Sequence, residues 1–182
     1  TALLAGDALQ ALAFGVLAKG ALRDPAVACA ELADAAGSDG MAGGQAIDLA
    51  AVGTALPLPE LEIMHARKTG ALIRAAIRLG ATAGPALPPA DLGALDAYAA
   101  AAGLAFQVVD DVLDVEGSAE TLGKTAGKDA AAGKPTFVSA LGLAGAKARA
   151  ESLRAGAHAA LAPLGPRGRR LAELADWIAL RA

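Results

Sequence analysis

A long apolar helix with polar side chains on one face constrains this chain more than any other stretch of its sequence. The segment is expected to begin at Asp91, which can cap it, and to run to about Glu116. Because each helical residue turns roughly 100°, four of its polar side chains share about a quarter of the circumference. They are Gln107, Asp110, Asp111 and Asp114. Apolar residues from Phe106 to Leu113 surround them, so we expect the carboxylates at the mouth of a cavity.

Neighbouring carboxylates repel one another unless a cation joins them. Mg²⁺ suits this face because it takes oxygen ligands from one or two carboxylates and completes its shell with water and substrate phosphate. The acid face therefore suggests a magnesium site and a diphosphate substrate. Taken alone, the same spacing also fits the solvated face of an amphipathic helix.

The composition predicts an all-α fold. The chain has 182 residues, of which 55% are hydrophobic and only 3% aromatic, and alanine dominates. Alanine favours helix, and the scarcity of β-branched and aromatic residues disfavours strands. We expect one domain over residues 1–182, with helix starts at Asp24-Pro25 and at Pro57–Glu60.

Charge, cysteine content and apolar run lengths narrow the function further. The formal net charge is −3 and there is no arginine-rich tract, so nucleic acid is not expected as the main partner. Cys29 stands alone, which fits a reducing compartment. The longest apolar runs, such as Ala11–Ala18 and Tyr98–Val109, fall short of the roughly 18 to 20 residues of a membrane span. We therefore expect no span.

The segment Gly40–Leu49 contains three glycines, each of which weakens a helix by about 1 kcal/mol relative to alanine. Missing side chains let another helix or a ligand come close to the backbone, and either reading is open. Gln45 and Asp48 stand three residues apart in this segment and offer polar groups on one face.

The sequence Lys68-Thr69-Gly70 interrupts a second helix. A threonine hydroxyl can bond to a carbonyl one turn back, and the glycine loosens the helix further, so we expect a kink that aims Lys68 inward. The alternative is an ordinary surface lysine. His65 is interpreted as a surface or packing residue, because no other residue at ligand spacing accompanies it.

A glycine-rich basic loop follows the acid face directly. Gly-Lys pairs occur at Lys124, Lys128 and Lys134. A cationic loop next to a metal site suits a polyphosphate, although a solvated flexible loop is the simpler reading of the loop alone.

Together these segments resemble the trans-isoprenyl diphosphate synthases, or polyprenyl synthetases, and within them the bacterial farnesyl diphosphate synthases. The similarity covers nearly the whole chain, in the order and spacing of that family. The matching stretches are Gly6–Gln10, Gly43–Leu49, His65 with Lys68–Arg74, Gly103–Asp114, Thr121–Lys124 and Gly133-Lys134.

The resemblance implies a role for each matching residue. Asp110 would be a direct Mg²⁺ ligand, and Asp111 and Asp114 would act mainly through metal-bound water. Thr69 and Gln107 would lie beside the first carbon of the allylic substrate. The lysines expected to contact the diphosphate are Lys68, Lys124 and Lys134. The residues expected to line the cavity are Gln45, Asp48 and Phe106.

The resemblance also implies the fold and the reaction. We expect a helical bundle around a central cavity, a homodimer, a cytoplasmic location, and Mg²⁺-dependent condensation of isopentenyl diphosphate with an allylic diphosphate to give farnesyl diphosphate. Alternatives are a geranyl or geranylgeranyl diphosphate synthase, or a non-catalytic subunit with the same fold.

The family has a first aspartate-rich motif upstream of the stretch that Gly6–Gln10 matches, and this sequence starts just past that place. We therefore expect the 182 residues to be the C-terminal part of a longer protein, incomplete at the N-terminus and inactive alone.

Overall fold

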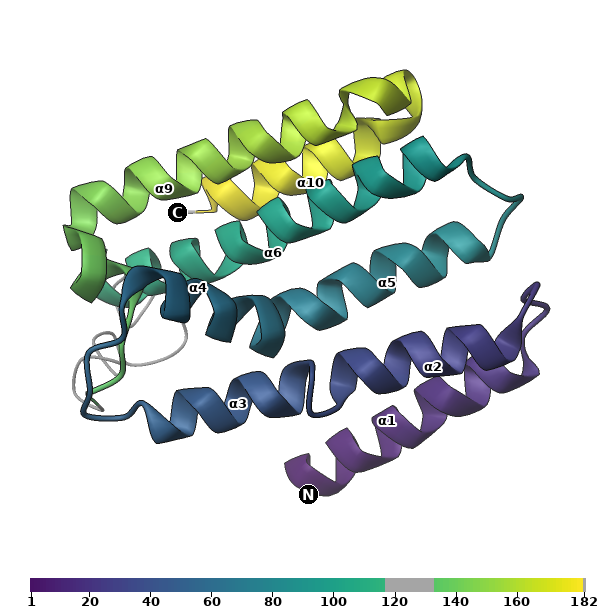
Figure 1. Cartoon of the computed structure of the whole chain (residues 1–182), viewed down its shortest axis with the longest axis horizontal. Helices are drawn as coiled ribbons and strands as arrows, with labels where there is room; N and C mark the ends of the chain where they lie inside the picture. The colour runs from purple at the N-terminus through teal and green to yellow at the C-terminus, as the bar shows by residue number, and fades with distance from the viewer. Residues whose placement is uncertain (117–132, 182) are drawn as a thin grey trace.

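The computed structural model describes residues 1–116 and 133–181, and every regular element in these ranges is helical (Figure 1). The all-α prediction is confirmed. The elements are α1 (Ala2–Lys19), α2 (Pro25–Ala36), α3 (Met41–Ala50), α4 (Leu58–His65), the π-helix η1 (Ala66–Gly70), α5 (Ala71–Thr82), α6 (Pro89–Glu116), α9 (Phe137–Leu161), the 3₁₀ helix η2 (Ala162–Gly168) and α10 (Arg169–Leu180).

The helices lie side by side in successive rows (Figure 1). The helix α1 packs on α2, and α2 packs on α5, which lies in line with α4 and η1. The long helix α6 packs on α5 and η1 on one side and on α9 and α10 on the other. The acid-bearing helix is thus central, which explains its apolar composition.

Helix ends follow the sequence signals. Asp24 caps α2 by accepting a hydrogen bond from the Val27 N–H at 3.1 Å, and Pro25 takes the first helical position. Thr136 caps α9 in a reciprocal capping box with Ser139. The expected kink near Lys68 takes the form of a π-helix, so the chain stays helical from α4 to α5 while its turn widens.

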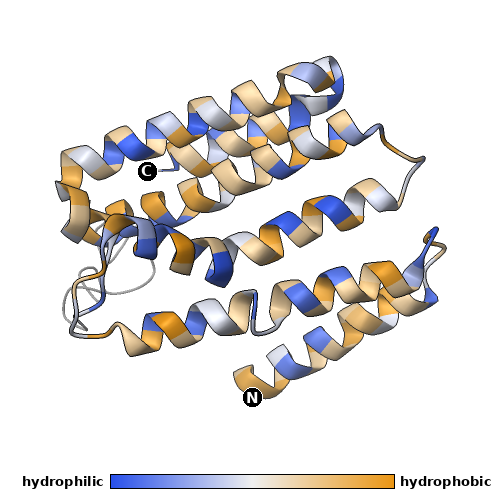
Figure 2. Ribbon diagram, in the orientation of Figure 1, coloured by the Kyte–Doolittle hydropathy of each residue, from blue (hydrophilic) through white to orange (hydrophobic). Residues whose placement is uncertain are grey.

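The hydrophobic core lies where α4, α6, α9 and α10 meet. Its largest fully buried side chains are Tyr98, Phe137, Leu61, Met64 and Val108. In Figure 2, apolar colouring runs along most of α6 and along one face of its neighbours. Burial in this core fixes the position of α6 and therefore of the acid face that it carries.

The N-terminal helix differs from the others because none of its residues is buried. Its Leu9, Leu12 and Val16 are 60% exposed or more. By length and composition alone, both α1 and α6 could cross a membrane, but half of the most apolar window of α6 is buried inside the bundle, as in a core helix. Core helices meet this criterion too, so the expectation of no span stays a prediction.

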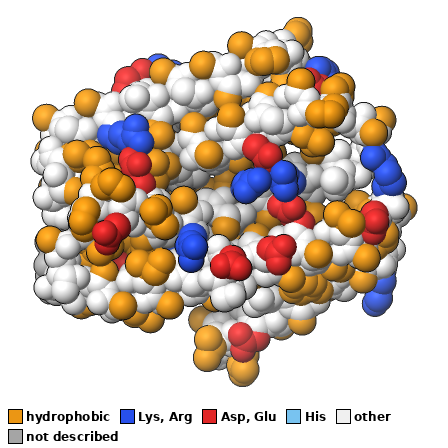
Figure 3. Space-filling view, in the orientation of Figure 1, with side chains coloured by type: hydrophobic (Ala, Val, Ile, Leu, Met, Phe, Trp, Pro, Cys, Tyr) orange, Lys and Arg blue, Asp and Glu red, His pale blue; other side chains and the backbone are white. Residues whose placement is uncertain are grey.

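Ion pairs cross-link the rows of helices. Arg78 of α5 contacts Glu31 of α2 at 3.1 Å and Asp96 of α6 at 2.8 Å, and Arg149 of α9 contacts Glu62 of α4 at 2.6 Å. On the face seen in Figure 3, positive and negative side chains are interspersed. Each exposed pair contributes at most about 1 kcal/mol, so these contacts orient the helices more than they stabilise them.

We expect Tyr98→Phe to lower the free energy of unfolding at pH 7 by about 1 to 2 kcal/mol. The buried Tyr98 hydroxyl donates to the Leu171 carbonyl at 2.7 Å, and the variant leaves that carbonyl without its donor. Burial raises the pKa of Tyr98 to about 12, whereas an unfolded chain ionises its tyrosine near pH 10. The stabilisation is therefore complete below pH 10 and is lost as the pH rises towards 12.

Urea denaturation of the parent and of Tyr98→Phe between pH 7 and 11 checks both statements. The chain has one tyrosine, so the difference between the two proteins isolates it. An equal alkaline loss of stability in both would contradict the assignment.

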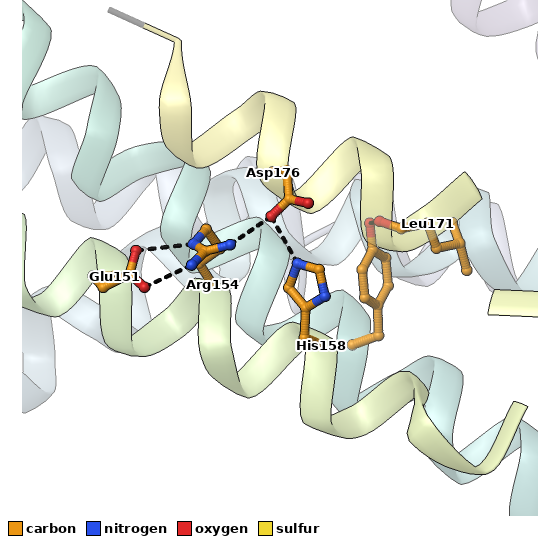
Figure 4. A network of polar contacts seen from close by, with 6 residues as sticks. Glu151, Arg154, His158, Leu171 and Asp176 are labelled. Carbon is orange, nitrogen blue, oxygen red and sulfur yellow. Dashed lines mark hydrogen bonds and ion pairs between the residues drawn. The ribbon is translucent and has the colours of Figure 1, made fainter. Parts of the chain in front are cut away.

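A polar network joins α9 to α10 (Figure 4). Asp176 accepts from His158 Nε2 at 2.7 Å and from Arg154 Nη1 at 2.7 Å, and Arg154 also pairs with Glu151. Hydrogen bonds from His158 and then Arg154 hold the pKa of Asp176 below its usual value of 3.8. The depressed pKa means that the carboxylate stabilises the fold above about pH 4 and loses this effect as the pH falls through its folded pKa.

We expect Asp176→Asn to lower the melting temperature slightly at pH 7 and to have no effect near pH 2. Thermal scans across this range measure the difference between parent and variant. Glu173→Gln is the matched control, because Glu173 lies on the same helix and, among the described residues, its ion pairs are with Arg169 and Arg170 of that helix. A difference that stays constant down to pH 2 would show that the carboxylate charge is not the cause.

Candidate active site

The predicted polar residues meet at one cavity. It has a volume of about 220 Å³ and lies between α3, α4, η1, α6 and the segment that leads into α9. Its lining residues are Asp48, His65, Lys68, Gln107, Asp110, Asp111, Lys134, Pro135 and Thr136. Because α4 and η1 are continuous, four separate segments of the sequence contribute to this polar site.

Lys68 points inward, as the helix interruption predicted, and its partner is Asp48. The Lys68 Nζ lies 2.6 Å from Asp48 Oδ2, with side-chain exposures of 27% and 6%. The wider turn of the π-helix η1 carries Lys68 and the neighbouring Thr69. The ion pair fixes an ammonium group at the cavity wall while most of the lysine stem is covered.

The glycines of α3 serve close helix packing. A Cβ at Gly44 would overlap the Lys68 backbone nitrogen and lie 2.6 Å from the Lys68 Cα. At Gly40 and Gly43, a Cβ would overlap the carbonyl oxygens of Ala35 and Ser38. The expected close approach of another helical segment is observed at Gly44, which lies against η1, and it brings Asp48 of the same helix within reach of Lys68.

A second close approach joins η1 to α6. A Cβ at Gly103 would lie 3.1 Å from the Gly70 Cα, so the two backbones nearly touch. Beside this contact, the Thr69 hydroxyl donates to Gln107 Oε1. The two residues expected near the reacting carbon are therefore in direct contact.

The three carboxylates of the acid face are not equivalent. Asp110 is half-buried and lines the cavity, whereas Asp111 and Asp114 are 5% and 4% exposed. Asp111 Oδ2 accepts a hydrogen bond from the Phe137 N–H at 2.7 Å, and Asp114 is not among the lining residues. Of the three, Asp110 is the best placed to bind a ligand in the cavity.

The basic loop is described only at its end. Lys134 is half-buried and lines the same cavity as Asp110 and Asp111. Lys124 and Lys128 lie outside the described residues. His65 is buried, so of the two expected alternatives a surface position is wrong. Its ring stacks on Phe137 with centroids 5.3 Å apart, and the residue also lines the cavity.

Arg181 lines a neighbouring cavity and lies close enough to Asp110 to be affected by its charge, which the sequence did not predict. Its guanidinium lies 4.0 Å from the centre of the Phe106 ring and donates to the Phe106 carbonyl at 2.9 Å. Burial lowers the pKa of Arg181, and the nearby Asp110 charge partly offsets this effect. The available signal was an arginine three residues after the buried Ile178, on the apolar stripe of the last helix.

Two further regions bear on the site. Gln45 is half-buried on α3 but does not line this cavity. A larger cavity of about 620 Å³ lies along the same helical row, next to Arg67, Arg74 and Asp39. Its walls are mostly apolar and it contains no residue of the acid face, so size alone does not identify the active site.

The residues of the smaller cavity fit a magnesium ion. Besides Asp48, which pairs with Lys68, the cavity has the carboxylates of Asp110 and Asp111 and the amide oxygen of Gln107, which are hard oxygen ligands of the kind that Mg²⁺ prefers. Mg²⁺ usually takes only one or two carboxylates plus substrate phosphate. Within residues 1–116 and 133–181, no group of three or more His, Cys, Asp or Glu side chains is close enough to hold an ion by itself. The donor set thus suits an ion that a phosphate ligand helps to bind.

Comparison with known proteins shows which family the chain resembles. A profile described as polyprenyl synthetase matches residues 1–159. The chain is 51% identical over 179 residues to the "Probable farnesyl diphosphate synthase" of Sinorhizobium fredii, covering 96% of this chain and 54% of that protein. It is 47% identical over 188 residues to the farnesyl diphosphate synthase of Escherichia coli, covering 99% of this chain and 63% of that protein.

The fold agrees with these matches. The crystal structure of the geranyltransferase of Helicobacter pylori complexed with magnesium and isoprenyl diphosphate superposes with a TM-score of 0.83 at 33% identity. The superposition covers 97% of this chain and 58% of that one. The chain thus spans between about half and two thirds of the length of these relatives. With a family profile that matches most of its length and with the helical fold of its relatives, the chain belongs to the polyprenyl synthetase family.

Proposed function

We propose that this protein is a Mg²⁺-dependent prenyltransferase that condenses isopentenyl diphosphate with dimethylallyl or geranyl diphosphate to give farnesyl diphosphate. The supporting observation is that Lys68 and Lys134 line the same polar cavity as Gln107, Asp110 and Asp111. Two cationic side chains suit a diphosphate, and two carboxylates suit the cation that accompanies it. Two relatives are named for the synthesis of farnesyl diphosphate, and a third is a geranyltransferase solved with magnesium and isoprenyl diphosphate.

The two lysines bind and orient the allylic diphosphate. Breaking the allylic C–O bond sends its electron pair onto the diphosphate, and positive charge held nearby stabilises this leaving group. Lys68 supplies such a charge in a fixed position, because its ion pair with Asp48 holds the ammonium at the wall. Preorganised charge costs no reorganisation during the reaction.

Thr69 and Gln107 lie beside the developing allylic cation. Their hydrogen bond fixes both oxygen atoms, whose lone pairs face positive charge favourably. The double bond of isopentenyl diphosphate then forms the new C–C bond, and a proton leaves the resulting cation to restore a double bond. No protein nucleophile is required.

Asp110 is the proposed direct ligand of Mg²⁺, and Asp111 and Asp114 act through metal-bound water. When bound, the ion supplies positive charge against the leaving diphosphate. The more open position of Asp110 supports its assignment as the direct ligand.

Product analysis tests the proposal. The purified protein is incubated with isopentenyl diphosphate and geranyl diphosphate in Mg²⁺, and the dephosphorylated products are separated by chromatography. A fifteen-carbon alcohol that disappears when Mg²⁺ is chelated supports the proposal. A ten- or twenty-carbon product would assign a different synthase, and no product from the protein together with its natural flanking sequence would overturn the prenyltransferase assignment.

The 182 residues alone are proposed to be inactive. Three carboxylates line the described cavity, but Asp48 is held by Lys68, so the carboxylates left for a metal ion, Asp110 and Asp111, both come from α6, whereas a diphosphate with its counter-ions calls for charge on both sides. Measurable turnover by the 182-residue chain in the same assay would refute this statement.

We further propose a homodimer in the cytoplasm. The exposed apolar residues of α1 are the kind of surface that association covers, and a single cysteine fits a reducing compartment. Sedimentation equilibrium tests the first statement, which a purely monomeric protein would refute. Cell fractionation tests the second.

A further inference from the structure

The segment Gly133–Phe137, here called the anchored segment, is fastened to the rest of the fold at both ends. At one end, the Gly133 carbonyl accepts from the Gly53 N–H at 2.8 Å. At the other, the Phe137 N–H donates to Asp111 Oδ2 at 2.7 Å. Lys134 lies between the two anchors and lines the active-site cavity. The two hydrogen bonds that fix the ends of the anchored segment therefore also restrict the position of Lys134.

The first anchor depends on backbone geometry that favours glycine. Gly53 has φ +78° and Gly133 has φ +64°, both in the left-handed region. This geometry lets the loop after α3 meet the anchored segment through backbone atoms alone. The buried Pro135 then restricts the chain between the anchors, because its ring fixes φ.

The second anchor satisfies the N-terminus of α9. Thr136 already caps the Ser139 N–H at 3.0 Å, but the Phe137 N–H is a free donor of the first turn. Phe137 is fully buried, so this donor needs a protein partner. A carboxylate is the most favourable one, because it gains both a charge-assisted hydrogen bond and the helix dipole.

A third helix supports the same point. The buried His65 of α4 stacks on the Phe137 ring, while Asp111 of α6 holds the Phe137 backbone. Phe137 is therefore gripped through its ring and through its N–H by two different helices. The start of α9 cannot shift without disturbing one of these contacts.

We propose that Asp111 is a positioning residue, which holds the start of α9 and thereby places Lys134 at the diphosphate. The inference rests on the proposed function, since it takes the cavity to bind a diphosphate. It gives two adjacent carboxylates of the same cavity different tasks: Asp110 is the proposed direct ligand of the ion, whereas Asp111, in addition to its proposed contact through metal-bound water, holds the segment that presents Lys134. The sequence alone does not show that Asp111 has this positioning role and Asp110 does not.

Two variants of Asp111 separate its hydrogen bond from its charge. Asp111→Asn and Asp111→Ala both remove the negative charge, but only asparagine keeps an oxygen that can accept from the Phe137 N–H. Loss of charge alone would strengthen binding of an anion equally in both. If Asp111 positions Lys134, Asp111→Ala should instead bind the anion more weakly than Asp111→Asn does.

The probe is inorganic pyrophosphate, titrated calorimetrically into the protein without Mg²⁺ at fixed ionic strength. We expect Asp111→Asn to bind within about threefold of the parent, and Asp111→Ala about tenfold more weakly, which corresponds to roughly 1.4 kcal/mol. Lys134→Met should weaken pyrophosphate binding by a similar factor. The double variant with Asp111→Ala should bind pyrophosphate no more weakly than either single variant. Equal affinities of Asp111→Ala and Asp111→Asn would overturn the proposal.

Amide hydrogen exchange gives a readout that is independent of ligand binding. The Phe137 and Lys134 amides should exchange faster in Asp111→Ala than in Asp111→Asn, with circular dichroism as a check that both variants are folded. If the parent binds no pyrophosphate without Mg²⁺, the exchange rates alone decide whether Asp111 anchors the segment, while the product analysis described above decides the proposed function. Unchanged exchange in Asp111→Ala would refute the anchor even if pyrophosphate binds.

Discussion

Asp110→Asn is expected to reduce prenyl transfer about a thousandfold, or by roughly 4 kcal/mol of transition-state stabilisation. Asparagine keeps the size of the side chain but removes the negative charge that a hard divalent cation requires. Asp110 is the carboxylate of the acid face that is half-buried and also lines the cavity, so no neighbour is equally well placed to replace it. Steady-state rates with isopentenyl and geranyl diphosphates over a range of Mg²⁺ concentrations measure the effect.

Asp39→Asn is the matched control for this experiment. Asp39 is an exposed aspartate next to the larger cavity of about 620 Å³, and we expect its loss to change the rate less than twofold. If Asp39→Asn abolished turnover and Asp110→Asn did not, the chemistry would belong to the larger cavity. The pair of variants therefore decides between the two cavities.

Gly44→Ala should destabilise the fold by about 3 kcal/mol and lower prenyl transfer at least tenfold. The added Cβ would lie 2.6 Å from the Lys68 Cα, and backbone atoms cannot move aside as a flexible side chain could. The helix α3 must therefore move away from η1, which breaks the contact of Asp48 with Lys68. Chemical denaturation and the prenyl transfer assay check the two effects separately.

Gly80→Ala provides the comparison, because Gly80 lies within α5 and an added Cβ there meets no atom within 4 Å. Alanine is the better helix former, so this variant should be more stable than the parent by up to about 1 kcal/mol. The two substitutions are chemically identical and differ only in their surroundings. A Gly44→Ala protein as stable as the parent would mean that α3 and η1 are not in close contact.

Much of the fold could be predicted from local patterns. The apolar helix from Asp91 to Glu116 is observed as Pro89–Glu116, and Asp24-Pro25 starts a helix as expected. These features depend on capping, on proline geometry and on periodicity, which act within a few residues of each other. The interruption at Lys68 was also visible, although its form as a π-helix was not.

The grouping of the candidate site residues was predicted mainly through the resemblance to a family. The cavity does bring Asp48, Lys68, Gln107 and Asp110 together. Their individual partners were not predictable, because an ion pair or hydrogen bond between residues 20 or more positions apart depends on which helices pack together. Asp48 with Lys68 is one such case, and Phe137 with Asp111 is another.

The contacts of Arg181 were not predictable from the sequence either. By periodicity it belongs to the apolar stripe of the last helix, and nothing in the sequence near it indicates a neighbouring aromatic ring. Only the packing of the end of the chain against α6 puts its guanidinium over Phe106 and within the field of Asp110.

By itself, the sequence determined that this protein is helical, which helix carries the carboxylates, and that those carboxylates share one face, because helix propensity and the 100° turn are local properties. Tertiary structure alone decided that Asp110 and Asp111 line one cavity and that Asp111 also binds the start of α9. The physical reason is that adjacent residues of a helix point in directions about 100° apart, and the surroundings in each direction are set by other helices.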